Sequence, residues 1–218
     1  MSGLKLYDFW RSSAAYRVRI GLNLKGLAYE AVPVNIAPGA DEHLAPAYRG
    51  KNPQARIPAL ETEAGVLTQS LAILDWLDEA YPDPPFLPAD PWARARARAF
   101  ALTVACDIHP LNNTSVLGRL KAQFGADEAA IGEWYRHWIA LGFEALEAQL
   151  KPRPHTQFAF GDTPTLADIC LVPQCYNARR FKLDVARFPR LAAIDEAARA
   201  HPAFEKAAPE NQKDAVKT

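Results

Sequence analysis

The sequence predicts a small α/β domain followed by an all-helical domain, with a proline-rich linker between the two. Short apolar runs that fit β-strands are confined to the first third of the chain. A cluster of prolines follows between residues 82 and 91, and helical periodicity dominates the chain after it. We expect the first domain to span residues 1–84 and the second to span residues 91–210.

The first domain mixes strand and helix signals. We expect strands at residues 4–7, 28–34, 57–60 and 66–68, with a hairpin turn at 61–65. Residues 12–25 are ambiguous, because residues 17–25 alternate like a strand, whereas the length of the segment and a possible N-cap at Ser12 or Ser13 favour a helix. Residues 70–81 repeat apolar side chains at helical spacing, which predicts a helix capped by Ser70.

The second domain shows only helix signals. We expect helices at residues 93–106, 126–150, 192–200 and 202–208. A further helix should begin after Thr165, because Thr165 and Asp168 have the spacing of a capping box. The polar tail at residues 209–218 is expected to be loose.

Composition limits the classes of function. The 25 basic and 25 acidic residues give zero net charge, so nucleic acid and anionic membranes are not expected as partners. The three cysteines, Cys106, Cys170 and Cys175, lack CxxC spacing and are expected to be buried, reduced thiols. Without a signal pattern or a long apolar stretch, we expect a cytoplasmic protein. No metal site is expected.

A hydroxyl at a helix start is the first candidate for chemistry. Arg11, Ser12 and Ser13 lie between an expected strand and the possible helix. The N-terminus of a helix offers a positive field and free N–H groups, and such a place lowers the pKa of a thiol and binds the thiolate. The alternative interpretation is a plain helix cap.

Two more features suit an anionic, peptide-like ligand. Ile57 and Pro58 stand at a strand entrance, where a cis-proline would leave the Ile57 backbone for an extended ligand. Gln69 and Ser70 open a helix with an amide, a hydroxyl and backbone N–H groups, which together suit a carboxylate. An edge-strand proline and another helix cap are the alternatives.

Taken in order, these elements resemble the thioredoxin-like, glutathione-binding domain of the glutathione transferases. Residues 161–168 are similar to a structural capping segment of that family's helical domain. Within the family, residues 9–20, 108–117 and 171–181 resemble the zeta class, which contains maleylacetoacetate and maleylpyruvate isomerases. The resemblance extends from about Leu4 to Pro209 and implies a thioredoxin-like domain followed by the family's helical C-terminal domain.

The resemblance implies glutathione as cofactor and a maleyl keto acid as substrate. Thiolate addition makes the double bond single, the bond rotates, and glutathione leaves unchanged. Ser12 would stabilise the thiolate, with Ser13 in reserve, while Arg11 and Arg180 would bind substrate carboxylates and the enolate. Residues expected to hold glutathione are His43, Ile57, Pro58, Gln69 and Ser70, and residues that line up with zeta-class ligand contacts are His109, Asn113 and Ser115.

One position departs from the zeta signature, which usually reads Ser-Ser-Cys. Ala14 stands where the cysteine belongs, so no protein thiol can act there. His109 resembles the maleylpyruvate branch, whereas Asn113 and Ser115 resemble the maleylacetoacetate branch, so the substrate and its pathway, gentisate or tyrosine breakdown, stay open. A conjugating transferase and a non-catalytic binding module are the rival interpretations. A homodimer is expected from the family.

Overall fold

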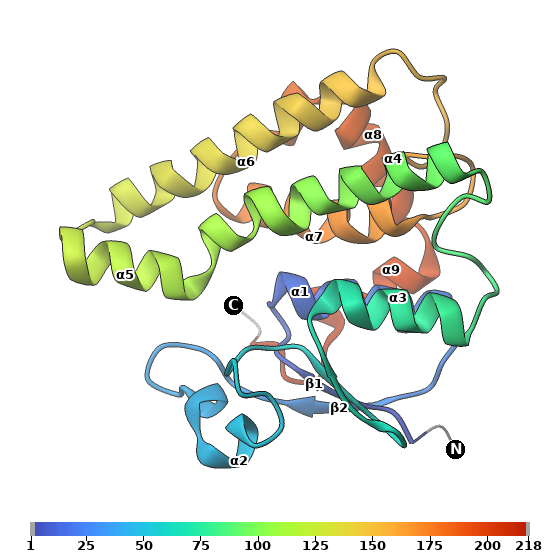
Figure 1. The fold of residues 1–218 in the computed structure, drawn as a ribbon. Coiled ribbons are helices and arrows are strands. Elements are labelled where there is room, and N and C mark those ends of the chain that lie inside the picture. The colour runs from blue at the N-terminus through green and yellow to red at the C-terminus, as the bar shows by residue number, and fades with distance from the viewer. Residues whose placement is uncertain (1–2, 217–218) are drawn as a thin grey trace. The chain divides into compact units, whose positions relative to one another are not determined.

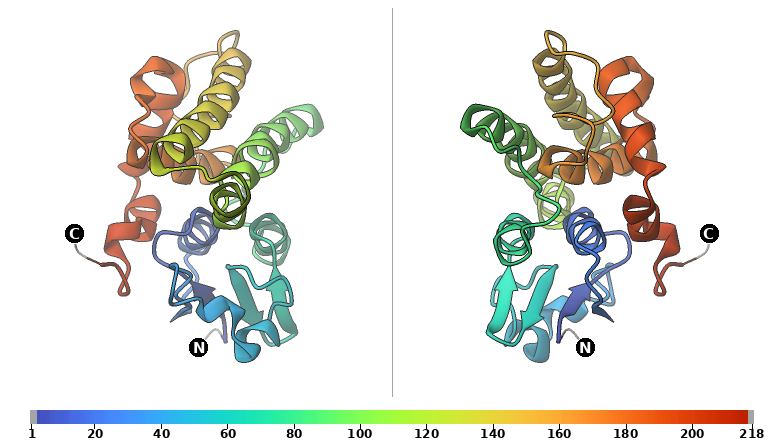
Figure 2. Two further views of the ribbon diagram at one scale, coloured as in Figure 1. Left: turned by 90° about the vertical axis from the view of Figure 1, so that its left-hand side faces the viewer. Right: turned by 90° about the vertical axis from the view of Figure 1, so that its right-hand side faces the viewer.

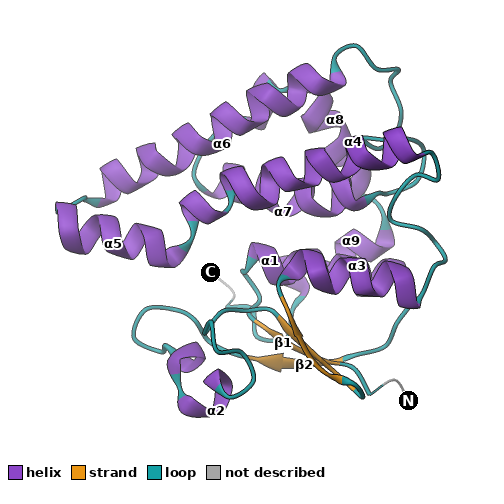
Figure 3. Cartoon of the chain, viewed as in Figure 1, coloured by secondary structure: helices purple, strands orange, loops and turns teal. Residues whose placement is uncertain are grey.

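The computed structural model describes residues 3–216 of the 218-residue chain, and these form two compact units. One unit contains the chain up to Pro85 together with the chain from His201 onward, and the other spans Phe86–Ala200. All four strands of the described residues belong to the first unit, and the second is built from helices (Figure 3). This arrangement confirms the predicted fold class of an α/β domain plus an all-helical domain.

A mixed sheet of four strands forms the centre of the first unit (Figure 1). The strands are β1 (Lys5–Asp8), β2 (Glu30–Pro33), β3 (Ala59–Thr62) and β4 (Gly65–Thr68), in the order β2-β1-β3-β4. β1 runs parallel to β2 and antiparallel to β3, and β3 and β4 form a hairpin. Leu6 and Leu60 face each other across β1 and β3 and are fully buried, which anchors this register.

Helices cover both faces of this sheet. They are α1 (Ser13–Leu24), α2 (Pro46–Arg49) and α3 (Ser70–Ala80), while α9 (Pro202–Ala207) belongs to the same unit and packs on α1. Figure 2 shows α1 and α3 side by side on one face of the sheet and α2 at the other face. The ambiguous segment is therefore a helix. Its strand-like alternation came from Arg17 and Arg19, which are buried with their apolar neighbours instead of facing water.

The C-terminal end of the chain packs on α1, which departs from the expected domain boundaries. We expected residues up to 210 to belong to the helical domain, but residues 201–216 group with the first unit. α9 packs along α1, and the Asn23 amide donates to the Ala203 carbonyl over 3.0 Å. The expectation of a loose tail is wrong for residues 209–216, because they are tied to the first unit by hydrogen bonds.

The second unit contains the remaining helices and short helical turns. They are α4 (Pro91–Leu102), a π-helical segment (Thr103–Ile108), a 3₁₀ turn (Pro110–Asn112), α5 (Thr114–Phe124), α6 (Glu128–Leu150), α7 (Leu166–Arg180), a 3₁₀ turn (Val185–Arg187) and α8 (Pro189–Arg199). α5 was not expected from the sequence. Val116, Leu117, Leu120 and Phe124 recur in it at helical spacing, which was an available signal, although none of its residues is buried.

The predicted capping box opens α7. The Asp168 carboxylate accepts from the backbone N–H and hydroxyl of Thr165 over 2.7 and 2.8 Å, and from the Ala159 N–H over 2.8 Å. Asp168 is fully buried, and that burial raises the pKa of its carboxyl group. The carboxylate therefore stabilises the start of a helix that runs through the centre of the second unit.

The cysteines follow the sequence expectation only in part. Cys170 and Cys175 are buried, and burial raises the pKa of the Cys175 thiol well above its usual range. Cys106 is exposed on the π-helical segment, so the expectation that all three are buried is wrong. In that segment the buried positions are Val104 and Ile108, and Cys106 lies between them on the exposed side.

Two other classes of feature, a membrane-spanning helix and a metal site, are absent from the described part of the chain. No helix there is long and apolar enough to cross a membrane. Between residues 3 and 216, no group of three or more His, Cys, Asp or Glu side chains is arranged to hold a metal ion.

Candidate active site

Ser12 lies at the end of a tight turn between β1 and α1. The Ser12 N–H donates to the Phe9 carbonyl over 2.9 Å, which closes a four-residue turn. Ser12 itself is extended, and its Oγ accepts the Ala15 N–H over 3.3 Å as the N-cap of α1. Within residues 3–216 its hydroxyl hydrogen meets no acceptor. The hydroxyl can therefore donate to an anion placed in the positive field of the helix start.

The two neighbours of Ser12 are placed differently. Ser13 is the first residue of α1 and is buried. Arg11 is exposed, and its guanidinium carbon lies 5.2 Å from the centre of the Trp10 ring. Ser12 is thus the better placed of the two serines, and Arg11 offers a positive charge beside it.

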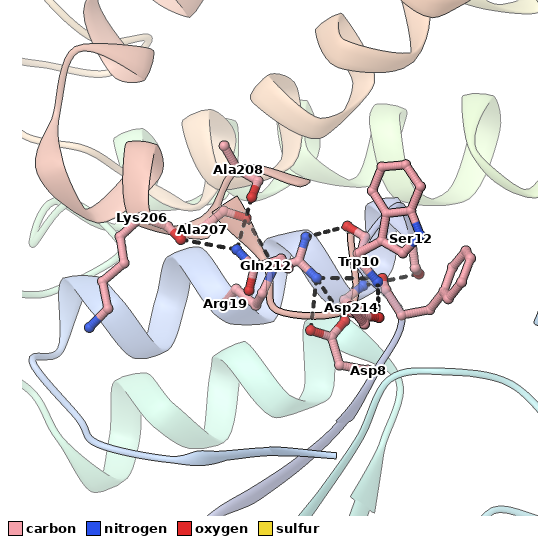
Figure 4. A network of polar contacts seen from close by, with 11 residues as sticks. Asp8, Trp10, Ser12, Arg19, Lys206, Ala207, Ala208, Gln212 and Asp214 are labelled. Carbon is pink, nitrogen blue, oxygen red and sulfur yellow. Dashed lines mark hydrogen bonds and ion pairs between the residues drawn. The ribbon is translucent and has the colours of Figure 1, made fainter. Parts of the chain in front are cut away.

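A buried ion pair between Arg19 and Asp8 lies beside the Phe9–Ser12 turn and contacts its backbone (Figure 4). Arg19 is fully buried, and its guanidinium contacts both carboxylate oxygens of Asp8 over 2.7 and 2.8 Å. It also donates to the Trp10 carbonyl over 2.8 Å. Burial raises the pKa of Asp8, against which the Arg19 charge acts. Sequence reasoning missed Arg19, although an arginine within an otherwise apolar helix segment was the available signal.

Ile57 and Pro58 stand immediately before β3. The bond between them is cis, as was expected for Pro58. Ile57 packs in an apolar cluster with Phe9 and Tyr48. Within the described residues, neither the N–H nor the C=O of Ile57 is hydrogen bonded, so both can pair with an extended peptide.

Gln69 and Ser70 begin α3, with their roles exchanged relative to the prediction. Gln69, not Ser70, is the N-cap, and its side chain makes no capping bond. Instead the Gln69 amide donates to Oε1 of Gln54 over 2.7 Å. The first turn of α3 contains no acidic residue. This helix start therefore keeps the positive field that suits a carboxylate.

A buried arginine from α1 reaches Ser70. Arg17 is 2% exposed, and its Nη1 donates to the Ser70 Oγ over 3.3 Å. This contact fixes the orientation of the Ser70 hydroxyl at the start of α3. Arg17 was not identified from sequence, because its place in an alternating pattern suggested a solvent-facing side chain.

The backbone of Gln69 is strained. Its φ of 68° is in the positive region that non-glycine residues rarely adopt, at a typical cost of about 1–3 kcal/mol. Such strain persists only where the surrounding structure holds the residue in place, and here the Gln69 amide is hydrogen bonded to Gln54.

We expect Gln69→Gly to raise the free energy of unfolding by about 1 kcal/mol, because the relief of strain exceeds the entropic cost of glycine. The same change should weaken binding of glutathione, the ligand that the family resemblance implies, because the amide is lost. Calorimetric titration and thermal unfolding measure the two effects. Lys182→Gly is the matched control, because Lys182 has φ of 59° in the second unit. Unchanged glutathione affinity in the Gln69→Gly variant would contradict a role for the amide.

His43 lies in a short 3₁₀ turn (Glu42–Leu44) of the first unit. Its ring is half-buried, and Nδ1 is buried without a hydrogen-bond partner in the described residues. A buried ring nitrogen without a partner costs free energy unless a ligand or water satisfies it. The predicted contact of His43 with glutathione therefore stays a prediction with a physical motive.

In the second unit, the predicted contacts at Asn113 and Ser115 have a structural role. Asn113 is the N-cap of α5, and its Oδ1 accepts from the N–H and Oγ of Ser115 over 3.0 and 2.9 Å. His109 is half-buried between the π-helical segment and the following 3₁₀ turn. Helix capping accounts for Asn113 and Ser115, and ligand contact by any of the three stays a prediction.

The two adjacent arginines at the end of α7 are distinct. Arg179 forms an ion pair with the buried Asp195 over 2.6 Å. Arg180 is exposed, and its guanidinium carbon lies 4.8 Å from the Phe181 ring centre. Arg179 is thus occupied by a structural pair, which leaves Arg180 as the candidate for substrate binding in this unit.

Comparisons with known proteins define the class. A family model described as the glutathione S-transferase N-terminal domain matches residues 6–85, and one for the C-terminal domain matches residues 128–194. The first match lies in the first structural unit and the second match lies in the second.

Curated relatives and solved structures narrow this class. A maleylpyruvate isomerase of Ralstonia sp. is 51% identical over 98% of this chain and 100% of its own, and a maleylacetoacetate isomerase of Pseudomonas aeruginosa is 47% identical over 97% and 98%. A holo structure of a zeta-class bacterial maleylpyruvate isomerase has a TM-score of 0.95 at 51% identity, covering 97% of this chain and all of that one. The chain therefore belongs to the glutathione S-transferase family, in its zeta class.

One solved relative contains a bound ligand. A maleylacetoacetate isomerase from Anaeromyxobacter dehalogenans, with glutathione bound in its active site, has a TM-score of 0.87 at 44% identity, covering 99% of this chain and all of that one. The residues of this chain fit the same ligand. The first unit offers a hydroxyl donor for a thiolate, an unbonded Ile57 backbone for a peptide, and the uncapped start of α3 for a carboxylate.

Proposed function

We propose that this protein is a glutathione-dependent cis–trans isomerase of a small maleyl keto acid, either maleylacetoacetate or maleylpyruvate. The observation that carries the proposal is the Ser12 hydroxyl, which caps α1 and still has a hydrogen to donate. The similarity to isomerases of both substrate types along nearly the whole chain supports it. The choice between the two substrates is left to experiment.

The protein residues have defined roles in this proposal. When bound, glutathione supplies a thiol that adds reversibly to the substrate double bond. Ser12 donates its hydroxyl hydrogen to the sulfur and, with the α1 N-terminus, favours the thiolate. Arg11 and Arg180 bind the carboxylates of the substrate and stabilise negative charge as it develops. Rotation about a single bond needs no proton transfer by the protein.

Glutathione itself is held by the first unit. The Ile57 backbone before Pro58 pairs with its peptide, and Gln69 and Ser70 bind its γ-glutamyl carboxylate. The buried Nδ1 of His43 forms a hydrogen bond with the same ligand. His109, Asn113 and Ser115 contribute from the second unit.

Ala14 has a direct chemical consequence. The position after the two serines carries no thiol, so mixed disulfides and alkylation of the protein cannot occur there. The proposed reaction is unaffected, because its nucleophile comes with glutathione. A substrate that reacts with thiols should therefore leave this position of the protein unmodified.

The proposal is tested by following the absorbance of maleylpyruvate and maleylacetoacetate in parallel, with and without glutathione. Glutathione-dependent loss of one substrate, with an unchanged thiol titre, supports the isomerase and identifies its pathway. A chlorinated nitrobenzene serves as the comparison substrate, since a conjugating transferase turns it over. Turnover of that compound without isomerisation of either keto acid contradicts the proposal, and activity toward none of the three would indicate a binding module.

We further propose that the protein acts as a cytoplasmic homodimer, on the basis of its family resemblance. Its substrates would arise in the breakdown of aromatic compounds. Size-exclusion chromatography with light scattering tests the assembly, and a mass of 24.1 kDa, that of one chain, contradicts it.

A further inference from the structure

The chain's C-terminal segment reaches the turn that carries Ser12. One oxygen of the Asp214 carboxylate accepts the backbone N–H of Trp10 over 3.1 Å, across 204 positions in sequence. Trp10 is a central residue of the Phe9–Ser12 turn. Figure 4 shows Asp214, Trp10 and Ser12 within a single polar network.

The path of the chain from α9 to Asp214 is fixed by hydrogen bonds. The Gln212 amide donates to the carbonyls of Lys206 and Ala208 over 3.0 and 2.8 Å, and so folds the chain back after α9. Arg19 donates to the Ala207 carbonyl over 3.0 Å, which joins α9 to the buried ion pair. These hydrogen bonds fix the backbone that leads to Asp214 and so place its carboxylate near Trp10.

The Trp10 peptide units are held from two sides. Asp214 accepts the N–H of Trp10, and Arg19 donates to its carbonyl over 2.8 Å. A turn whose central residue is fixed at both polar groups has little freedom to rotate, and the next residues along are Arg11 and Ser12. Donors that stabilise charge act best when preorganised, since small misplacements are costly.

We infer that Asp214 is a positioning residue for Ser12, and that the C-terminal tail is part of the apparatus that activates glutathione. This inference rests on the proposed role of Ser12. Asp214 acts through its hydrogen bond to Trp10, not through contact with the ligand. The acceptor oxygen, rather than the negative charge, is the feature that matters.

Three variants separate these properties. Asp214→Ala removes the acceptor, and Asp214→Asn keeps a carbonyl acceptor without the charge. Glu210→Ala is the matched control, because Glu210 is an exposed acid of the same segment. Thermal unfolding of each variant verifies that the fold is retained.

The first readout is hydrogen exchange of the Trp10 amide in the protein without glutathione, measured by NMR. We expect exchange to be at least about tenfold faster in Asp214→Ala, and unchanged in Asp214→Asn and Glu210→Ala. Unchanged Trp10 exchange in Asp214→Ala contradicts the proposal that Asp214 holds the Trp10 backbone, whatever reaction the protein catalyses.

The second readout is the pKa of glutathione bound to the protein, titrated by thiolate absorbance, together with kcat and KM. Asp214→Ala should raise this pKa and lower kcat about tenfold with little change in KM for the keto acid, while Asp214→Asn should resemble the wild type. Faster exchange with unchanged thiol pKa and kcat overturns the positioning role. If the wild-type protein isomerises neither keto acid, the proposed function fails while exchange and the thiol pKa still test Asp214.

Discussion

Replacing Ser12 with alanine is expected to lower kcat for isomerisation about 100-fold, the typical effect of removing one donor to a developing or stabilised anion. Within the described residues, Ser12 is the hydroxyl at the start of α1 that meets no acceptor for its hydrogen. Without it, the thiol of bound glutathione should keep a higher pKa and be protonated over more of the neutral range. Steady-state kinetics across pH measures both effects.

Loss of the helix cap accompanies this substitution, so its structural effect needs a control. Removing the Ser12 cap should lower the free energy of unfolding by about 1 kcal/mol. Ser12→Thr keeps both the cap and the hydroxyl and should retain most activity. Ser13→Ala tests the reserve candidate, which is buried. If Ser12→Ala stays fully active while Ser13→Ala does not, the thiolate partner is Ser13.

The largest effect on stability is expected from Arg19→Met. The guanidinium is fully buried and contacts both oxygens of Asp8 as well as the carbonyls of Trp10 and Ala207. Its removal leaves a buried carboxylate without its counter-charge, which typically costs about 3–5 kcal/mol. Chemical denaturation of the two proteins measures the difference in the free energy of unfolding.

Asp8 supplies the companion test. Burial already raises its pKa above the ordinary 3.8, and Arg19 opposes that rise. In Arg19→Met the folded-state pKa rises further above the unfolded value. The deficit relative to the wild type should therefore be smallest at acidic pH, where Asp8 is protonated, and grow as the pH rises through that raised pKa. Adding Asp8→Asn should recover part of the loss at neutral pH, and a deficit independent of pH would contradict this account.

Regular elements with local signals were predictable from sequence. The strands of the first unit and the capping box of α7 left clear patterns of apolar spacing and cap residues. α5 was missed although Val116, Leu117, Leu120 and Phe124 recur at helical spacing, and in the structure none of its side chains is buried. The segment that became α1 was ambiguous because Arg17 and Arg19 are buried, and no local pattern distinguishes a buried arginine from an exposed one.

The places of the candidate site residues in the fold could be predicted only where a local sequence signal marks the start of an element. Ser12, Ile57 and Gln69 each stand at the start of an element, so their positions could be read from the elements. Arg17 and Asp214 act through contacts with residues 53 and 204 positions away. Such pairings depend on the tertiary fold, and the tail that carries Asp214 looked like loose polar chain.

The most direct test of the proposed reaction is conversion of the keto acid at a glutathione concentration far below that of the substrate. An isomerase regenerates glutathione in each cycle, so we predict complete conversion of maleylpyruvate or maleylacetoacetate with an unchanged final thiol titre. Conversion that stops when the product equals the glutathione supplied, with loss of free thiol, would show that the protein conjugates its substrate and would contradict the account.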